Sequence, residues 1–315
     1  MDSIFLALNV VFPIFFMLMV GYVIQRLHWV DEYSLNIMNK VDFRIFIAIL
    51  VFLNIYGMDL REVINKNTAK LIILMWFCVF FAIISSKLIL GRIVDSEKKV
   101  AVMTQGIYRS NLVLFGIPVA STLYGEEGVA VAAILIGTVV PLFNLMAVIL
   151  LEKARAGKAN IKKTILGIIK NPLIIASVLG LLFSGFRIQI PDLLLSPLTS
   201  MSQVATPLAF VILGASLHFS SLRRNLKYLL TVSVGKLILV PALAFTIAYF
   251  MGFRDAALAA ILGAMASPTA VSSFSMAKEL DVEGELAGQI VAFDSVLSIV
   301  TIFFWVIGLR NLGML

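Results

Sequence analysis

The chain has 315 residues, of which 61% are hydrophobic and only 14% are charged, and its mean hydropathy is +1.03. One soluble core cannot bury that much apolar surface, so the composition excludes a soluble globular domain and indicates a protein of the lipid bilayer. The net charge of +7 does not indicate nucleic-acid binding, because most basic residues fall in alternate loops. The single cysteine, Cys78, lies in an apolar segment, which leaves neither a disulfide framework nor a cysteine metal cluster. No metal and no cofactor is predicted.

Apolar segments follow one another along almost the whole chain. A membrane-spanning helix needs about 20 mostly apolar residues. The sequence predicts ten such helices, which start near residues 4, 37, 69, 99, 127, 164, 195, 228, 255 and 286. Residues 1–9 lack the positive start of a signal peptide and are assigned to the first helix. Lysine and arginine concentrate in the loops after the odd-numbered helices, so these loops are predicted to be cytoplasmic. A multi-pass protein of the plasma (inner) membrane with both termini on the outer side follows.

An internal repeat divides the chain into halves. Residues 101–128 and 257–284 align without a gap, and each stretch contains an interior proline and ends in Glu-Gly. Further matches in the same order are Pro13 and Gly21 with Pro172 and Gly180, and Gly57 with Gly214. Because a five-helix unit is odd, the second unit enters the membrane in the opposite orientation. The predicted fold is an all-α integral membrane protein of ten transmembrane helices in two inverted five-helix repeats, residues 1–151 and 164–315, joined by a basic cytoplasmic linker, residues 152–163.

Helices four and nine are each interrupted at matching places. The interruptions are Gly116-Ile117-Pro118 and Ala266-Ser267-Pro268-Thr269. Ser267 and Pro268 are predicted to cap and to begin a half-helix, whose free N–H groups favour an anion. In transporters built from inverted repeats, the substrate site lies near the midplane at such broken helices. An ordinary proline kink is the alternative.

Two polar residues precede the first interruption. Arg109 at membrane depth needs a partner or an aqueous path, and its planar guanidinium suits a carboxylate. Asn111 can donate to a ligand oxygen. Alternatively, Arg109 extends to the cytoplasmic surface and Asn111 only caps a helix. Asn144 in the fifth helix is a candidate for the cavity wall or for a bond between helices.

Other charged residues lie inside apolar segments. Asp294 in the tenth helix is predicted to carry a coupling proton or, equally, to be a structural carboxylate. Lys236 in the eighth helix is a possible partner for it. Lys40, Asp42 and Arg44 are interpreted as an interfacial charge cluster rather than as substrate ligands.

Four segments carry a resemblance to a known family. "RSNLVLFGIPVA…YGEEG", "NPLIIASVLGLLF", "TPLAFVILGASL" and "ASPTAVSSFSMAKEL" resemble the corresponding segments of the auxin efflux carrier family, which includes bacterial malate or malonate permeases. The resemblance implies crossed broken helices as the substrate site, with Asn111, Gly116, Pro118, Ser267, Pro268 and Thr269 as the crossover elements. It also implies an elevator motion, a homodimer formed through the scaffold, a scaffold of about residues 1–60 and 164–220, and a transport unit of about residues 66–151 and 226–312.

The predicted function is a secondary transporter of a small organic anion, a mono- or dicarboxylate, with H+ as a possible coupling ion. A ligand sensor or an anion channel on the same fold is the alternative. An intramembrane enzyme is disfavoured: Asp42 and Asp294 lie in unlike contexts for an aspartate pair, and no catalytic motif accompanies them. Ala48 stands where the family has a proline, which departs from the pattern in the second helix.

Overall fold

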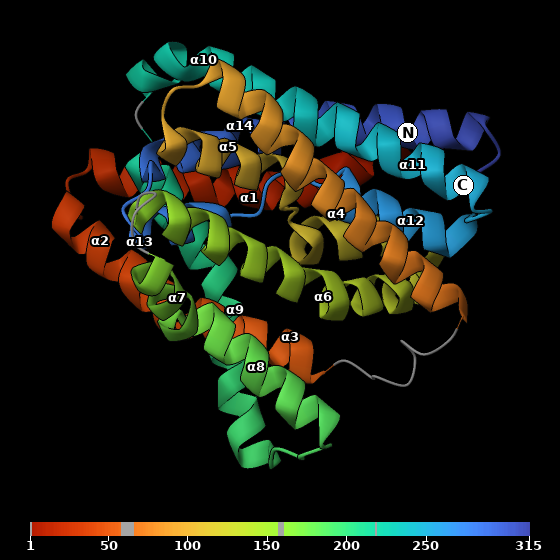
Figure 1. Ribbon diagram of the computed structural model, residues 1–315, viewed down its shortest axis with the longest axis horizontal. Helices are drawn as coiled ribbons and strands as arrows, with labels where there is room; N and C mark the ends of the chain where they lie inside the picture. Colours follow the sequence, from red (N-terminus) through yellow and green to blue (C-terminus); the bar gives the residue numbers. More distant parts are fainter. Residues whose placement is uncertain (1, 58–65, 157–160, 218) are drawn as a thin grey trace.

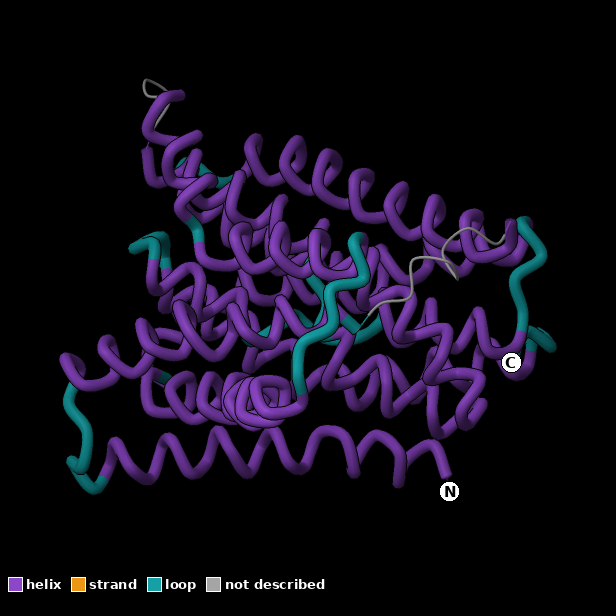
Figure 2. The backbone as a smooth tube through the Cα atoms, turned by 90° about the horizontal axis from the view of Figure 1, so that it is seen from below, coloured by secondary structure: helices purple, strands orange, loops and turns teal. Residues whose placement is uncertain are grey.

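The computed structural model describes residues 2–57, 66–156, 161–217 and 219–315. Within these ranges the chain consists of helices joined by short loops and contains no β-strand (Figure 2). An isolated antiparallel bridge between Ser110 and Thr269 interrupts the helical pattern. The prediction of an all-helical chain is therefore confirmed for these ranges.

The first elements form three long helical stretches (Figure 1). The second stretch begins at an N-cap, because the Asp31 carboxylate accepts the N–H of Ser34 at 2.8 Å. A π-helical turn in the middle of that stretch does not interrupt it. The elements are α1 (Asp2–Arg26), α2 (Glu32–Val41), the π-helical turn η1 (Asp42–Phe46), α3 (Ile47–Tyr56) and α4 (Lys66–Ile93).

The centre of the chain contains a break and a kink. Helix α5 (Glu97–Tyr108) ends before Arg109, whose backbone is extended. The π-helical turn η3 (Leu112–Gly116) and helix α6 (Ile117–Ala156) follow. The 40 residues of α6 would span about 60 Å as a straight helix, twice the thickness of the hydrocarbon core. A kink at Gly125, with φ 54°, divides it into two shorter pieces.

The remaining elements are also helices, of 5 to 28 residues. Asn171 caps a helix by accepting the N–H of Leu173 at 3.0 Å, and proline occupies the first position after the cap. Helices also extend into both ends of the predicted linker 152–163, of which residues 157–160 lie outside the described ranges. The elements are α7 (Ile161–Lys170), α8 (Pro172–Gly185), α9 (Asp192–Ser216), α10 (Phe219–Val234), η4 (Gly235–Leu239), α11 (Val240–Phe250), α12 (Asp255–Met265), α13 (Ser272–Glu279) and α14 (Gly284–Asn311).

Several helices have the length and composition that a membrane requires. Among the described residues, five helical stretches are long and apolar enough to cross a bilayer: α4, η3 with α6, α9, α10 with α11, and α14. Shorter apolar helices accompany them in α1, α8 and α12. Many large apolar side chains of these helices are exposed, as expected of surfaces that face lipid.

Helices from the two halves pack closely against each other. Helix α1 lies along α9, and α3 lies along α8. Glycines allow the first contact: a Cβ on Gly21 would collide with the backbone oxygen of Val211, and one on Gly214 would collide with that of Leu18. Small residues at such crossings let two backbones approach, which is how helices associate in membranes.

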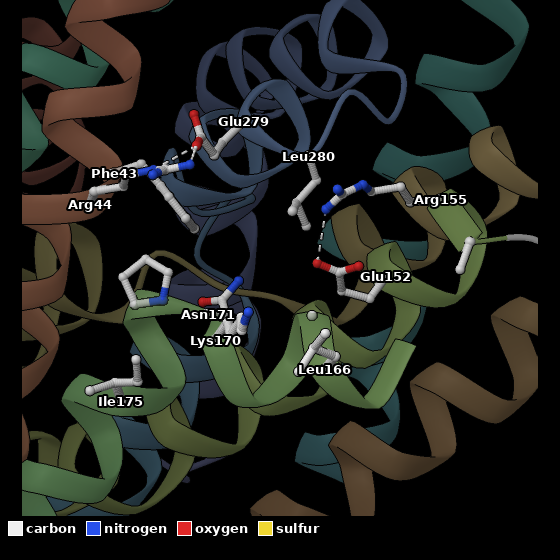
Figure 3. A pocket seen from close by; sticks show the side chains of 13 residues that line it. Phe43, Arg44, Glu152, Arg155, Leu166, Lys170, Asn171, Ile175, Glu279 and Leu280 are labelled. Carbon is white, nitrogen blue, oxygen red and sulfur yellow. Dashed lines mark hydrogen bonds and ion pairs between the residues drawn. The ribbon is translucent and has the colours of Figure 1, made fainter. Parts of the chain in front are cut away.

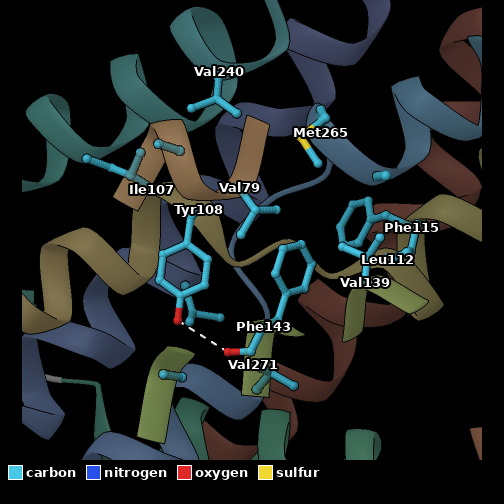
Figure 4. Close-up of a cluster of buried hydrophobic side chains, with 14 of the residues drawn as sticks. Val79, Ile107, Tyr108, Leu112, Phe115, Val139, Phe143, Val240, Met265 and Val271 are labelled. Carbon is cyan, nitrogen blue, oxygen red and sulfur yellow. Dashed lines mark hydrogen bonds between the residues drawn. The ribbon is translucent and has the colours of Figure 1, made fainter. Parts of the chain in front are cut away.

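A cluster of buried aromatic and aliphatic side chains surrounds the break between α5 and η3 (Figure 4). The Tyr108 hydroxyl donates to the Phe143 carbonyl at 3.2 Å, and the two ring centroids are 6.0 Å apart. Phe115 and Met265 are almost completely buried in the same region. The contacts of Tyr108 fix the end of α5 against α6.

Candidate functional site

The break after α5 and the break after α12 cross each other. The Asn111 N–H donates to the Pro268 carbonyl at 2.8 Å, and the Ala270 N–H donates to the Arg109 carbonyl at 3.2 Å. Together with the bridge between Ser110 and Thr269, these bonds pair the two extended segments antiparallel. Backbone groups that no helix satisfies are thus satisfied by the opposite half of the chain.

The first break lies earlier than its glycine and proline indicate. The backbone leaves the helix at Arg109 to Asn111, whereas Gly116 closes a π-helical turn and Pro118 lies in the first turn of α6. The helical run is continuous from Leu112 of η3 into α6, so Pro118 does not interrupt the chain. Gly116 instead packs against α12: a Cβ on Gly263 would lie 2.7 Å from the Gly116 Cα. The predicted interruption at Gly116-Ile117-Pro118 is therefore wrong by several residues.

The second break also differs in detail from the prediction. Helix α13 begins at Ser272, after Val271, and not at Pro268. Ser267 does not cap α13, because its hydroxyl donates back to the Gly263 carbonyl in the last turn of α12. The predicted role of Ser267 and Pro268 as cap and first residue of a half-helix is wrong. Pro268 supplies a carbonyl to the crossing instead.

Arg109 is buried between the crossing and α6. Only 2% of the residue is exposed, so its side chain does not extend to a surface. Its Nη2 donates to Asn144 Oδ1 at 2.5 Å, and its Nη1 has no partner. No carboxylate among the described residues forms an ion pair with it. The guanidinium is therefore held in place by a neutral amide while its charge remains uncompensated.

A cavity of about 60 Å³ lies beside the crossing. Three buried nitrogen atoms of its lining residues have no hydrogen-bond partner: Arg109 Nη1, Asn111 Nδ2 and Asn144 Nδ2. All three are donors, and an anion such as a carboxylate offers only acceptors. The other polar lining residues are Ser110 in the break, Asn54 of α3, Thr206 of α9 and Ser272 of α13.

The structure divides the predicted site residues into two groups. Arg109, Asn111 and Asn144 line the cavity. Gly116, Pro118, Ser267, Pro268 and Thr269 do not belong to its lining; Pro268 and Thr269 form part of the crossing itself. Sequence reasoning missed Ser110, Asn54, Thr206 and Ser272. Asn54 carries the same signal that marked Asn111, a polar side chain within an apolar run, whereas Thr206 and Ser272 carry no distinguishing signal.

Two buried charged residues support the crossing on its far side. The Lys236 ammonium donates to Ser110 Oγ and, at 3.4 Å, to the Met265 carbonyl. Asp294 accepts the Ser233 hydroxyl at 2.5 Å and lies 2.7 Å from Thr269 Oγ1. Lys236 and Asp294 thus contact the two residues of one bridge, but they form no direct ion pair. The described residues hold no cluster of three metal-ligating side chains.

A larger pocket of about 820 Å³ lies near the ends of α6 and α13 (Figure 3). Two ion pairs line it: Arg44 Nη2 with Glu279 Oε1 at 2.6 Å, and Arg155 Nη1 with Glu152 Oε1 at 3.2 Å. The lining also includes Phe43, one helical turn before Ile47 of the small cavity. The two spaces therefore follow each other along the same helices. The interfacial cluster expected at residues 40–44 is divided, because Lys40 and Arg44 are exposed while Asp42 is fully buried.

Comparison with known proteins agrees with this architecture. Residues 6–306 match the family described as membrane transport protein. An uncharacterized transporter of Methanothermobacter thermautotrophicus is 25% identical over 303 residues, which cover 94% of this chain and 96% of the relative. An uncharacterized transporter of Methanocaldococcus jannaschii is 23% identical over 313 residues, 95% of this chain and 97% of the relative. With its apolar helices and crossed breaks, this chain is a multi-pass membrane protein and belongs to the membrane transport protein family of the auxin efflux carriers.

Proposed function

We propose that this protein is a secondary transporter of a small organic anion, a mono- or dicarboxylate. The observation that carries the proposal is the set of three unpartnered N–H donors of Arg109, Asn111 and Asn144 around one buried cavity. Buried donors are normally satisfied, so an unsatisfied set beside an uncompensated guanidinium favours an acceptor-only ligand. The carboxylate is expected to receive hydrogen bonds from Arg109 and Asn111, while Asn144 orients the guanidinium.

Substrate entry requires the cavity to open. The space beside the crossing is about 60 Å³, which corresponds to a few water molecules. The larger pocket lies one helical turn away. Its two arginines are paired with carboxylates, so Lys170 leaves the lining with one excess positive charge, which favours an anion. We assign this pocket as the cytoplasmic entrance, because Lys and Arg are concentrated at this end of the helices. This orientation places both termini on the outer side of the plasma membrane.

The proposed architecture is ten spanning helices in two inverted repeats. The packing supports it: if the first and sixth spans correspond, and the second and seventh, then the contact of α1 with α9 and the contact of α3 with α8 are the same contact in the two halves. The breaks after α5 and after α12 are likewise corresponding elements, and they meet each other. Residues 1–151 and 164–315 are proposed as the two repeats.

We assign α1 to α3 together with α8 and α9 to a scaffold, and the remaining spans to a transport unit. The scaffold helices contact one another, and the crossing packs within the other group. The small cavity lies between the two groups, with Asn54 and Thr206 on the scaffold side and Arg109 and Asn111 on the transport side. An elevator motion of the transport unit would carry a bound anion past the scaffold, which is expected to form a homodimer.

Asp294 is the residue proposed to couple transport to H+. The Thr269 hydroxyl lies within bonding distance of both Asp294 Oδ2, at 2.7 Å, and the Gly106 carbonyl, at 2.8 Å, but it has one proton to donate. A proton on Asp294 resolves this competition, because Asp294 then donates to Thr269 and Thr269 donates to Gly106. Lys236 holds the other residue of the bridge, Ser110, so the protonation of Asp294 bears directly on the crossing.

The test is uptake of radiolabelled acids by purified protein in liposomes, with and without a proton gradient. Malate, malonate, succinate, lactate and indole acetate form the panel. Saturable uptake of one acid by the unaltered protein, lost in Asn111→Ala and retained in the matched variant Asn36→Ala at an exposed position, supports the proposal. Ionic currents far above any exchange rate would indicate a channel. Binding without uptake would indicate a sensor on the same fold.

A further inference from the structure

A second set of buried polar atoms without partners lies away from the anion cavity, in α2 and η1. Asp42 is 0% exposed, and neither of its carboxylate oxygens has a hydrogen-bond partner. No ion pair among the described residues includes it. An ionised carboxylate that is buried without a donor or a cation is strongly disfavoured. Asp42 therefore requires a positively charged ligand of some kind.

Asn39 lies one helical turn before Asp42 and offers another unpartnered acceptor. Its Nδ2 donates to the Ser275 carbonyl of α13 at 3.2 Å, which fixes the orientation of the amide. Its Oδ1 then has no partner, although the residue is 1% exposed. Residues three apart on a helix are neighbours on one face. Asn39 and Asp42 thus present acceptors beside each other and no donor.

We propose that Asp42 is a proton-binding site, and that its proton holds η1 against α13. A single proton on the carboxyl removes the buried charge and supplies the missing donor, with Asn39 Oδ1 as its acceptor. A proton also fits the available space, because the Asp42 oxygens have less than 1 Å² of accessible surface each, so that not even a water-sized particle reaches them. A metal ion would need room and further charged ligands, and the described residues contain no acidic cluster of that kind.

Asn39 connects this site to an acidic groove. The groove, about 450 Å³ in volume, is lined by Asn39 and by four carboxylates: Glu32, Glu279, Asp281 and Glu285. These carboxylates can exchange protons with solvent next to Asn39. Lys278 is a cation in this lining, and its ammonium donates to Ser216.

The cations on the elements packed against Asp42 are either exposed or bonded to another residue. Helix α2 brings Lys40, which is exposed, and η1 brings Arg44, which pairs with Glu279 of α13. Helix α13 also brings Lys278. Helices α3 and α8 carry no charged residue, and α9 carries only Asp192 at its first position. No described cation is thus free to replace the proton on Asp42.

Ionisation of Asp42 would therefore open the interface between η1 and α13. The Arg44 to Glu279 pair joins η1 to α13, and the Asn39 to Ser275 bond joins the adjoining end of α2 to the same helix. The protonated form exists at low pH and closes the interface; raising the pH removes the proton, and the carboxylate must then reach water. The assignment of a proton to Asp42 depends only on the burial and the missing hydrogen-bond partners of Asp42 and Asn39. The effect of this proton on transport rests on the proposed function, in which η1 belongs to the scaffold and α13 to the transport unit.

Infrared difference spectroscopy of the full chain in nanodiscs tests the proton directly. The unaltered protein is expected to show the C=O band of a protonated carboxyl at neutral pH. That band should disappear in Asp42→Asn and persist in Asp294→Asn. Unchanged protonated-carboxyl bands in Asp42→Asn at every pH would overturn the proposal.

Thiol labelling tests the interface. Ser275→Cys is introduced after Cys78→Ser, and its maleimide labelling rate is divided by that of Asn311→Cys, an exposed reference away from the groove that cancels the intrinsic pH dependence of thiols. The ratio should rise with pH, by up to about tenfold per pH unit while the closed form still holds the proton, and level off once the proton is lost; it should be independent of pH when Asp42→Asn is added. A flat ratio with Asp42 present overturns the proposal even if Asp42→Asn does not fold. Neither readout uses substrate, so failure of the anion panel leaves both intact.

Discussion

Ser110 and Thr269 form an antiparallel bridge at the centre of the molecule, and each of them also contacts a buried charged side chain. Lys236 donates to Ser110, and Asp294 lies 2.7 Å from Thr269 Oγ1. Each charged side chain therefore contacts a different residue of the bridge, and the two do not form a direct ion pair. A change of charge at either residue bears on the crossing that positions Asn111.

Replacing Arg109 by glutamine is expected to weaken substrate binding. The substitution removes the charge and an unpartnered donor that lines the cavity. A hydrogen bond to a charged group contributes about 1.5–3 kcal/mol, so the KM for uptake should rise by roughly tenfold to a hundredfold. Initial uptake rates over a range of substrate concentrations give this value. The exposed residue Arg187, changed to glutamine, is the control, and an unaltered KM in Arg109→Gln contradicts the anion site.

Gly263→Ala is expected to destabilise the fold. The added Cβ would lie 2.7 Å from the Gly116 Cα, and backbone cannot move aside as a flexible side chain can. Overpacking of this kind costs about 1–3 kcal/mol, which a lower thermal midpoint in detergent would reveal. Gly308→Ala in α14 is the matched control, because a Cβ there meets no atom within 4 Å. Equal midpoints for the two variants would show that α12 and the end of η3 are not in contact.

Exchanging the charges of Arg44 and Glu279 tests the interface between η1 and α13. Arg44→Glu and Glu279→Arg alone should each increase the labelling of Ser275→Cys, and the double exchange should reduce it again. Arg44 is 56% exposed, so little change in thermal stability is expected from an ion pair of this kind. Equal labelling in the single and double variants would show that the ion pair between Arg44 and Glu279 does not hold the interface closed.

Asp294→Asn is expected to remove the dependence of uptake on a proton gradient. Asparagine can retain the hydrogen bonds to Ser233 and Thr269 but cannot exchange a proton. Accumulation of the anion against its own gradient should therefore fail, while counterflow exchange continues. Asp192→Asn at an exposed position is the control. Accumulation that still follows the proton gradient in Asp294→Asn assigns coupling to another group.

Asp31 should give α2 a pH-dependent contribution to stability. The hydroxyl and the N–H of Ser34 bond to its carboxylate and lower its pKa below the ordinary value. A depressed pKa means that the stabilisation is complete above the ordinary pKa of the carboxyl and is lost as the pH falls through the lowered value. Thermal unfolding of Asp31→Ala should therefore differ from that of the unaltered protein at neutral pH, and the two should converge in strong acid. A constant difference at every pH would exclude this cap.

Much of the fold can be predicted from the sequence because membrane insertion depends on local composition. Apolar runs of sufficient length predict helices, and nearly every predicted segment is helical where the structure describes it. Polar residues inside such runs are costly, so Arg109, Asn111 and Asn144 were conspicuous without any structure. The internal match of residues 101–128 with 257–284 likewise predicted that the two interruptions correspond.

The exact places of the breaks were decided by tertiary contacts. Glycine and proline mark where a helix can end, but Arg109 to Asn111 leave the helix because Pro268 and Ala270, in the other half, bond to their backbone. In the same way, Thr206 and Ser272 line the cavity only because α9 and α13 pack beside the crossing. Asp42 appears interfacial from its charged neighbours, yet packing buries it completely. The sequence by itself determined the membrane environment, the helices and the polar candidates, because these depend on residues that are neighbours in the chain. The crossing, the cavity and the burial of the Asp42 carboxylate depend on residues far apart in the chain, and only the tertiary structure brings these residues together.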